Sequence, residues 1–238
     1  MVILYGAALL LAAYLLGSIP SGLLIVRLTT GKDVRTIESG RTGGTNVARA
    51  AGMWAGVFTA IFDGLKAAIS VWLSQWLFPQ VMWLHILAPI AAILGHNYSI
   101  FMIEKDANGK IRLRGGAGGA SCVGGSLGLW APSILIIIPV GAAILFLLGY
   151  ASVATLSAAL VSTLIFAYRA WMGASPWEYT IYGILAFFLL AWALRPNIKR
   201  LILGTERIVG LRARRHKADG QETDDSKRDS LSSVNSNH

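Results

Sequence analysis

Two glycine-rich basic segments contain the residues of this chain that are best suited to chemistry. Residues 39–46 read SGRTGGTN, and residues 112–119 read RLRGGAGG. Glycine lets backbone N–H groups crowd around an anion, while arginine supplies positive charge and forked hydrogen-bond donors. The two segments together predict a site that binds phosphate.

Three side chains outside these segments, and Ser39 within the first, could assist such a site. Asp63 and Lys66 interrupt an apolar stretch and lie three residues apart, so they share one helix face and could pair. An ionisable side chain at the centre of a bilayer costs about 2.5–3.5 kcal/mol on insertion scales. Lys66 is therefore either an internal ion-pair partner or a cation directed at the phosphate loops. His96 precedes the second segment as a packing, capping or proton-transfer residue, and Ser39 opens the first segment, where it could bind phosphate or assist proton transfer.

The composition is that of a membrane protein. Of 238 residues, 55% are hydrophobic and only 14% are charged, against roughly 25% in a typical soluble domain. The formal net charge of +9 suits anionic lipid head groups or phosphorylated substrates, and it equally suits the excess of basic residues in cytoplasmic loops. No aromatic and basic surface suggests nucleic acid. Because Cys122 is the single cysteine, an intramolecular disulfide and a cysteine metal cage are excluded. We expect neither a metal nor a cofactor.

Hydropathy predicts a polytopic bundle of transmembrane helices. A spanning helix needs about 20 apolar residues. The apolar blocks are residues 2–26, 53–78, 83–103, 123–148, 151–168 and 177–194.

Loop charges predict the topology. The loops at 27–52 and 104–120 are rich in lysine and arginine, and the turn between residues 78 and 83 carries no charge. Two crossings separate the basic loops, so both should lie on the cytoplasmic face, with the N-terminus outside. The basic stretch 195–215 should also be inside, which requires an odd number of crossings. Either block 123–148, with Pro132 and Pro139, or block 53–78, with its polar interruption, must then be divided or re-entrant.

No Ser-His-Asp set, His–Glu zinc motif or Walker sequence is evident. With no convincing nucleophile, direct transfer between two bound substrates is the simplest scheme, and proximity is its main catalytic resource. Arginines and loop N–H groups would stabilise developing oxyanions.

From residue 17 to about residue 206 the chain resembles the PlsY-type acyl-phosphate:glycerol-3-phosphate acyltransferases, which are bacterial integral membrane enzymes. The long motif in the first glycine segment carries most of the resemblance. The matching stretches are Gly17-Ser18-Ile19-Pro20, Asp33-Val34-Arg35, Ser39-Gly40-x-x-Gly43-x-Thr45-Asn46-x-x-Arg49, Asp63-x-x-Lys66, Gly95-His96, Arg114-Gly115-Gly116-x-Gly118 and Asn197-Ile198-x-Arg200-Leu201-x-x-Gly204-Thr205-Glu206.

The resemblance implies an all-α integral membrane protein with about seven transmembrane helices, some of them short or broken. It also implies acyl transfer from acyl phosphate to the 1-position of glycerol 3-phosphate, which gives lysophosphatidate and inorganic phosphate for phospholipid biosynthesis. The implied catalytic residues are Ser39, Arg49, His96 and Asn197. The implied phosphate-binding and substrate-binding residues are Gly40, Arg41, Gly43, Thr45, Asn46, Lys66, Arg114, Gly115, Gly116 and Gly118. Asp63 and Glu206 would be structural.

The chain departs from the family pattern near the expected site. Ala117 stands where the family normally has lysine, Leu194 where it has histidine, and Arg41 where it has asparagine. Residues 104–111 form an insertion. Arg41, Arg112 or Arg114 could restore the lost charge, but none replaces the chemistry of histidine.

Two alternatives to the acyltransferase therefore remain. One is a paralogue with an altered substrate, or a non-catalytic protein that binds a phosphorylated lipid or solute. The other is a small transporter of a phosphorylated solute.

The expected organisation is a membrane domain over residues 1–206 and a basic, then disordered, cytoplasmic tail over residues 207–238. We expect a monomer in the bacterial inner membrane that contacts membrane lipids and whose active site faces the cytoplasm.

Overall fold

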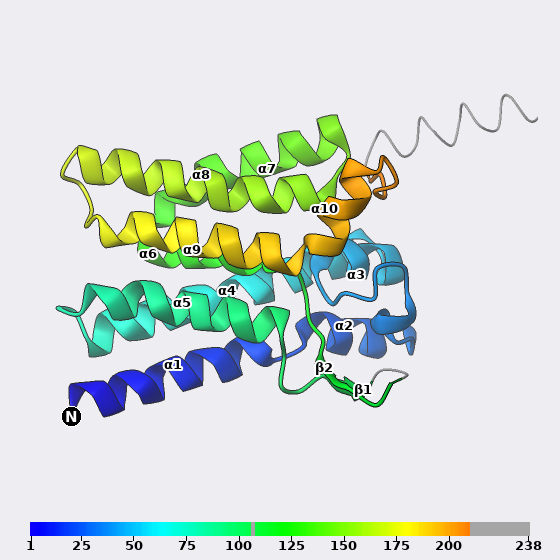
Figure 1. Ribbon diagram of the computed structural model, residues 1–238, viewed down its shortest axis with the longest axis horizontal. Helices are drawn as coiled ribbons and strands as arrows, with labels where there is room; N and C mark the ends of the chain where they lie inside the picture. The colour runs from blue at the N-terminus through cyan, green and yellow to red at the C-terminus, as the bar shows by residue number, and fades with distance from the viewer. Residues whose placement is uncertain (106–107, 210–238) are drawn as a thin grey trace, which may run out of the picture.

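The computed structural model describes residues 1–105 and 108–209, so the expected disorder of the tail falls almost entirely outside the described residues. These residues form a bundle of helices that lie side by side along its long axis (Figure 1). Its elements are α1 (Val2–Ser18), α2 (Ser21–Thr30), η1 (Val34–Thr36), α3 (Gly44–Ala51), α4 (Met53–Leu77), α5 (Met82–Asn97), β1 (Ile103–Lys105), β2 (Ile111–Leu113), α6 (Gly119–Leu129), η2 (Ala131–Ser133), α7 (Ile134–Leu148), α8 (Ala151–Trp171), α9 (Glu178–Ala193) and α10 (Arg195–Ile202).

The predicted helical membrane fold is confirmed. Within the described ranges, four helical segments are long and apolar enough to cross a membrane, or five if the pair α9–α10, bent by 70°, counts as one. The exact number of crossings, about seven in the prediction, is not settled by this criterion. Large apolar side chains cover the outside of the bundle, including Leu135 and Phe188, as expected for a surface that faces lipid.

The apolar block 123–148 is divided, whereas block 53–78 is not. A short 3₁₀ turn that contains Pro132 separates α6 from α7, because proline lacks the N–H that would continue the helix. In contrast, α4 runs unbroken through Asp63 and Lys66. The block with the prolines is therefore the one that the chain splits.

Small residues allow the helices at the centre to approach closely. A Cβ added at Gly124 of α6 would lie 1.9 Å from the carbonyl oxygen of Gly64 on α4. Close backbone approach of this kind is common between membrane helices, where dispersion contacts replace the hydrophobic effect. Tyr182 and Phe166 are fully buried beside these helices, and the Tyr182 hydroxyl donates to the Cys122 carbonyl at 2.7 Å.

A small antiparallel hairpin is an addition that the all-helical prediction lacks. β1 and β2 pair Ile103 with Leu113 and Glu104 with Arg112, so apolar and charged residues alternate across the ladder. The two strands lie at the two ends of the predicted insertion. It lies at the same end of the bundle as α2, α3 and α10, opposite the N-terminus (Figure 1).

Candidate active site

One buried amide shapes the first glycine segment. The Asn46 side chain donates to the carbonyls of Val34, Ile37 and Arg41 at 3.2, 3.0 and 2.9 Å. Gly40 adopts φ +65°, a left-handed conformation that glycine tolerates without strain. The hydrogen bonds of Asn46 thus stabilise the conformation of this loop.

Arg41 joins the two glycine segments to the end of α9. Its guanidinium donates to the Gly116 carbonyl at 3.0 Å and to the Ala193 carbonyl at 2.5 Å. The backbone N–H of Thr42 also donates to the Gly115 carbonyl at 3.4 Å. Three segments that lie far apart in the sequence therefore meet at one end of the bundle.

The second glycine segment is folded against the end of α5. The Gly116 N–H donates to the His96 carbonyl at 2.9 Å. A Cβ at Gly115 would lie 2.1 Å from the same carbonyl oxygen, and a Cβ at Gly116 would lie 1.9 Å from Nε2 of His96. Only glycine fits both positions, because backbone or a buried ring occupies the space that a side chain would need.

Asp63 and Lys66 form a buried polar network with His96. Asp63 Oδ1 lies 3.4 Å from His96 Nδ1 and 2.7 Å from Lys66 Nζ, and Lys66 also donates to the Ile19 carbonyl at 2.5 Å. The predicted pairing of Asp63 with Lys66 is confirmed. Lys66 is linked to the glycine loop through Asp63 and His96, so its substrate-binding role stays a prediction.

Residues 197–207 are joined to one another and to the first glycine segment by hydrogen bonds and ion pairs. Glu206 accepts from the Asn197 amide at 2.7 Å and from Arg200 Nε at 3.2 Å. Arg207 pairs with Glu38 at 3.3 Å, which ties this segment to the first glycine loop beside Ser39. The side-chain oxygen of Asn197 is buried without a hydrogen-bond partner in the described structure, so it is available to accept a hydrogen bond from a bound hydroxyl.

Two arginines supply much of the positive charge. Desolvation lowers the pKa of Arg41 from its ordinary value; Arg200 adds to this effect, while Tyr98 and Glu206 oppose it. Desolvation also lowers the pKa of Arg49, which Arg207 reinforces and Glu38 opposes. Both guanidinium groups stay charged, because arginine does not lose its proton in proteins near neutral pH.

An ion-pair network that includes Arg114 of the second glycine segment was not predicted from the sequence. Arg35 pairs with Asp33 at 2.6 Å and with Glu104 of the hairpin at 2.9 Å, and Arg114 pairs with Glu104 at 2.6 Å. The Arg35 guanidinium, helped by Arg27, holds the pKa of Asp33 well below its usual range. The alternation of acidic and basic residues in the insertion at residues 104–111 is the sequence pattern that indicates such ion pairs.

The remaining predicted residues surround this centre. Ser39 Oγ accepts from the Arg41 N–H at 3.4 Å, Gly43 caps α3, Thr45 is exposed in the first turn, and Arg49 lies in the last turn. Gly118 adopts φ +84° at the start of α6, where a Cβ would lie 2.9 Å from the Asn97 side chain. Within residues 1–105 and 108–209, no hydrogen bond or ion pair joins Ser39 to His96.

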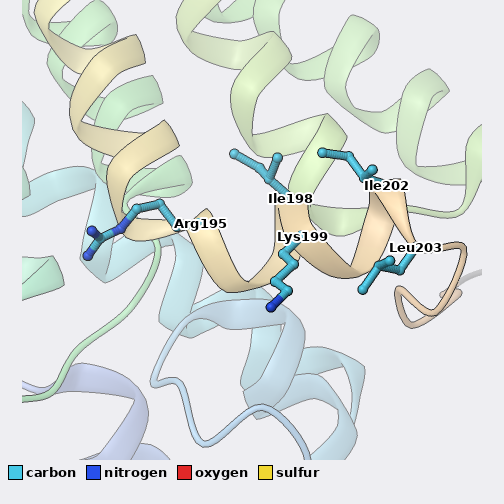
Figure 2. Close-up of a pocket in the computed structure, with 5 residues that line it drawn as sticks. All are labelled: Arg195, Ile198, Lys199, Ile202 and Leu203. Atoms are coloured by element: carbon cyan, nitrogen blue, oxygen red, sulfur yellow. The ribbon is translucent and has the colours of Figure 1, made fainter.

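The described part of the chain has an apolar groove and a shallow hollow. An apolar groove of about 440 Å³ runs between α4, α6 and α7 and begins near Ala120, two residues after Gly118. A shallow hollow of about 300 Å³ lies against α10. Figure 2 shows Ile198 and Ile202 on one side of α10 and Lys199 on the other, an amphipathic arrangement typical of a helix at a membrane surface.

Comparison with known proteins identifies the family. The family model described as "Glycerol-3-phosphate acyltransferase" matches residues 7–204. A glycerol-3-phosphate acyltransferase of Thermus thermophilus is 37% identical over 210 residues, covering 86% of this chain and 95% of the relative. One of Myxococcus xanthus is 35% identical over 201 residues, covering 84% and 98%.

Solved structures agree with these matches. The crystal structure of PlsY (YgiH), an integral membrane glycerol 3-phosphate acyltransferase, in its glycerol 3-phosphate form superimposes with a TM-score of 0.74 at 30% identity, covering 87% of this chain and 96% of that chain. The lysophosphatidic acid form gives a TM-score of 0.71 at 29% identity. With most of its length matched in sequence and in fold, the chain belongs to the glycerol-3-phosphate acyltransferase (PlsY) family.

Proposed function

We propose that this chain transfers an acyl group from acyl phosphate to the 1-hydroxyl of glycerol 3-phosphate, producing lysophosphatidate and inorganic phosphate for phospholipid synthesis. The new ester bond forms as the bond between the acyl carbon and the phosphate oxygen breaks. The proton of the hydroxyl leaves with the phosphate. The observation that carries the proposal is the bridge from Arg41 to Gly116 and Ala193, which gathers the basic loops at one end of a membrane bundle.

The roles of the loops follow from the two phosphate groups that the reaction brings together. Arg49 and the N–H groups of Gly115, Gly116 and Gly118 would bind phosphate and stabilise the developing oxyanion. Ser39 would orient the attacking hydroxyl and pass its proton on. Holding both substrates in line supplies most of the acceleration, since effective molarities of oriented groups are very large.

Asn197, with its buried, unpartnered side-chain oxygen, would accept a hydrogen bond from glycerol 3-phosphate. Glu206 would keep Asn197 in place through their 2.7 Å hydrogen bond. His96 packs against Gly116 and would position the second glycine loop through this contact.

The apolar groove between α4, α6 and α7 would hold the acyl chain. Its volume of about 440 Å³ is within the usual range for ligand pockets, and its lining includes Val57, Ile61, Val123 and Leu127. It begins where the second glycine loop enters α6. An acyl phosphate could then place its chain in the groove and its phosphate at the loop.

The site would face the cytoplasm of the inner membrane, where soluble glycerol 3-phosphate is available. The basic loops and α10 at the same end of the bundle support this orientation through the positive-inside rule. The protein would act as a monomer that draws acyl phosphate from the membrane.

A phosphate-release assay tests the function. Purified protein is mixed with acyl phosphate, glycerol 3-phosphate or both. Turnover that requires both substrates supports the acyltransferase. A second candidate function is that of a paralogue with an altered substrate, or of a non-catalytic binding protein. Ala117 and Leu194 favour this candidate. Binding of glycerol 3-phosphate without turnover would support it. Uptake of the solute into proteoliposomes without acyl transfer would instead indicate a transporter.

A further inference from the structure

Arg169 lies in the last turn of α8, and the turn from α8 to α9 lies at the end of the bundle opposite α3, α10 and the hairpin (Figure 1). We propose that Arg169, stacked on Trp130, binds the phosphate of a membrane phospholipid at this end. The site is separate from the candidate active site, so the inference does not depend on the proposed function.

The first argument is the isolation of the charge. Arg169 is the only lysine or arginine in the segments that lie at this end of the described bundle, which are the start of α1, the α4–α5 turn, η2 and the α8–α9 turn with its flanking residues. Glu178 is the one acid in these segments, and no ion pair joins it to Arg169 in the described structure. The guanidinium therefore carries a positive charge that an anion can compensate.

The second argument is the fixed position of the guanidinium. Its Cζ lies 4.0 Å from the centre of the Trp130 ring, and its Nη2 donates to the Ala174 carbonyl at 2.7 Å. The Ala174 N–H donates back to the Arg169 carbonyl at 2.7 Å, and Gly173 adopts φ +67° in the turn between them. Trp130 itself packs against the hydrophobic core. A cation held in this way loses little conformational freedom when it binds a ligand, which favours affinity.

The third argument is the surplus of hydrogen-bond donors. The bond to Ala174 uses one of the five N–H donors of the Arg169 guanidinium. Its Nε is buried without a hydrogen-bond partner in the described structure, and so is the hydroxyl of Ser175 in the same turn. Buried polar groups without a partner are rare in folded proteins. Phosphate offers several acceptor oxygens in the forked geometry that arginine matches, so it is the anion that this surplus favours.

The aromatic residues around Arg169 favour a lipid as the source of the phosphate. Tyr168, Trp171 and Trp177 are each at least 60% exposed, and the rings of Tyr168 and Trp171 lie 6.1 Å apart. Exposed tryptophan and tyrosine at the ends of membrane helices mark the level of the lipid head groups. At that level the available anion is the phosphate of a phospholipid, and the site would bind it beside the aromatic rings.

The test measures lipid binding to the full-length protein, purified and delipidated in detergent. Native mass spectrometry counts bound phosphatidylglycerol, and the rise in melting temperature with lipid concentration gives the apparent affinity. We expect Arg169→Met to weaken the affinity for phosphatidylglycerol about tenfold, the cost of losing a charged hydrogen bond. Arg195→Met is the matched control, because Arg195 also stacks on a tryptophan, with its Cζ 3.4 Å from the centre of the Trp192 ring. The control should stay close to wild type.

Two further probes separate the sources of the phosphate. Diacylglycerol with the same acyl chains lacks the phosphate and should stabilise the wild type less than phosphatidylglycerol does. Inorganic phosphate should stabilise the wild type and Arg169→Met equally. An effect of inorganic phosphate that disappears in Arg169→Met would indicate a site for dissolved anions and would overturn the assignment to lipid.

Equal affinities of the wild type and Arg169→Met for phosphatidylglycerol would overturn the inference, and so would equal losses in Arg169→Met and Arg195→Met. Equal stabilisation by diacylglycerol and phosphatidylglycerol would show that the acyl chains bind and the phosphate does not contribute. If Arg169→Met does not fold, Arg169→Lys replaces it. Lysine keeps the charge but loses the forked donors, so its affinity should lie below that of the wild type, and an unchanged affinity would contradict the role of the guanidinium.

Discussion

Replacing Gly116 with alanine is the sharpest test of the arrangement of the second glycine loop. A Cβ at this position would lie 1.9 Å from Nε2 and 2.6 Å from Cε1 of His96. The His96 ring is buried and its other nitrogen lies 3.4 Å from Asp63, so it has little freedom to move aside. Either the ring or the loop must shift.

The expected cost follows from these contacts. Overpacking a filled interior costs about 1–3 kcal/mol in the free energy of unfolding. For a chain of this size, that cost lowers the melting temperature by about 2–12 °C. The effect on activity should be larger, because a displacement of about 1 Å in a substrate-positioning loop can cost about a hundredfold in rate.

The assay compares thermal unfolding in detergent with phosphate release. Gly141→Ala is the matched control, because no heavy atom lies within 4 Å of a Cβ at that position in α7. There alanine should be neutral or stabilise by up to about 1 kcal/mol through helix propensity. A Gly116→Ala protein with the melting temperature and turnover of the wild type would show that the loop does not rest on His96, and the reasoning would fail.

Three other perturbations test separate parts of the structure. Arg49→Ala should abolish turnover and leave the size-exclusion profile unchanged; normal phosphate release would remove Arg49 from the site. Asp63→Asn leaves Lys66 buried without its anion and should lower the free energy of unfolding by about 3–5 kcal/mol. The double variant Asp63→Asn/Lys66→Met should recover part of that loss. Equal melting temperatures of the wild type and the single variant would contradict this. Because the folded pKa of Asp33 is depressed, its ion pairs stabilise the protein above about pH 4 and lose this effect as the pH falls. The difference in melting temperature between wild type and Asp33→Asn should therefore shrink below pH 4, and a constant difference would argue against the pairing.

Much of the fold could be predicted because hydropathy and loop charge report directly on the bilayer. Two crossings between the basic loops placed both at one end, and the hydrogen bond from Thr42 to Gly115 joins them there. The sequence offered two blocks that could be divided and no means of choosing. In the structure Pro132 divides its block, whereas Asp63 does not interrupt α4, because its charge is matched within one helix turn by Lys66.

Less of the site could be predicted, because its decisive contacts link distant residues. Arg41 reaches the Ala193 carbonyl across 152 positions in the sequence. No local pattern encodes that distance, which depends on how α9 packs beside α5. The role of Glu104 was likewise hidden, since only the paired hairpin directs it towards Arg35 and Arg114.

The helix break at Pro20 and the buried pair of Asp63 and Lys66 are structurally connected. Pro20 breaks the first apolar block between α1 and α2, and the break leaves the carbonyls of Ser18 and Ile19 outside regular helix hydrogen bonding. Ser99 Oγ donates to the Ser18 carbonyl at 2.5 Å, and Lys66 donates to the Ile19 carbonyl at 2.5 Å. Irregular backbone persists at membrane depth only where protein or water satisfies it. The break therefore helps to hold Lys66, Lys66 pairs with Asp63, and Asp63 contacts the histidine beside the second glycine loop, so the unwound segment helps to position that loop.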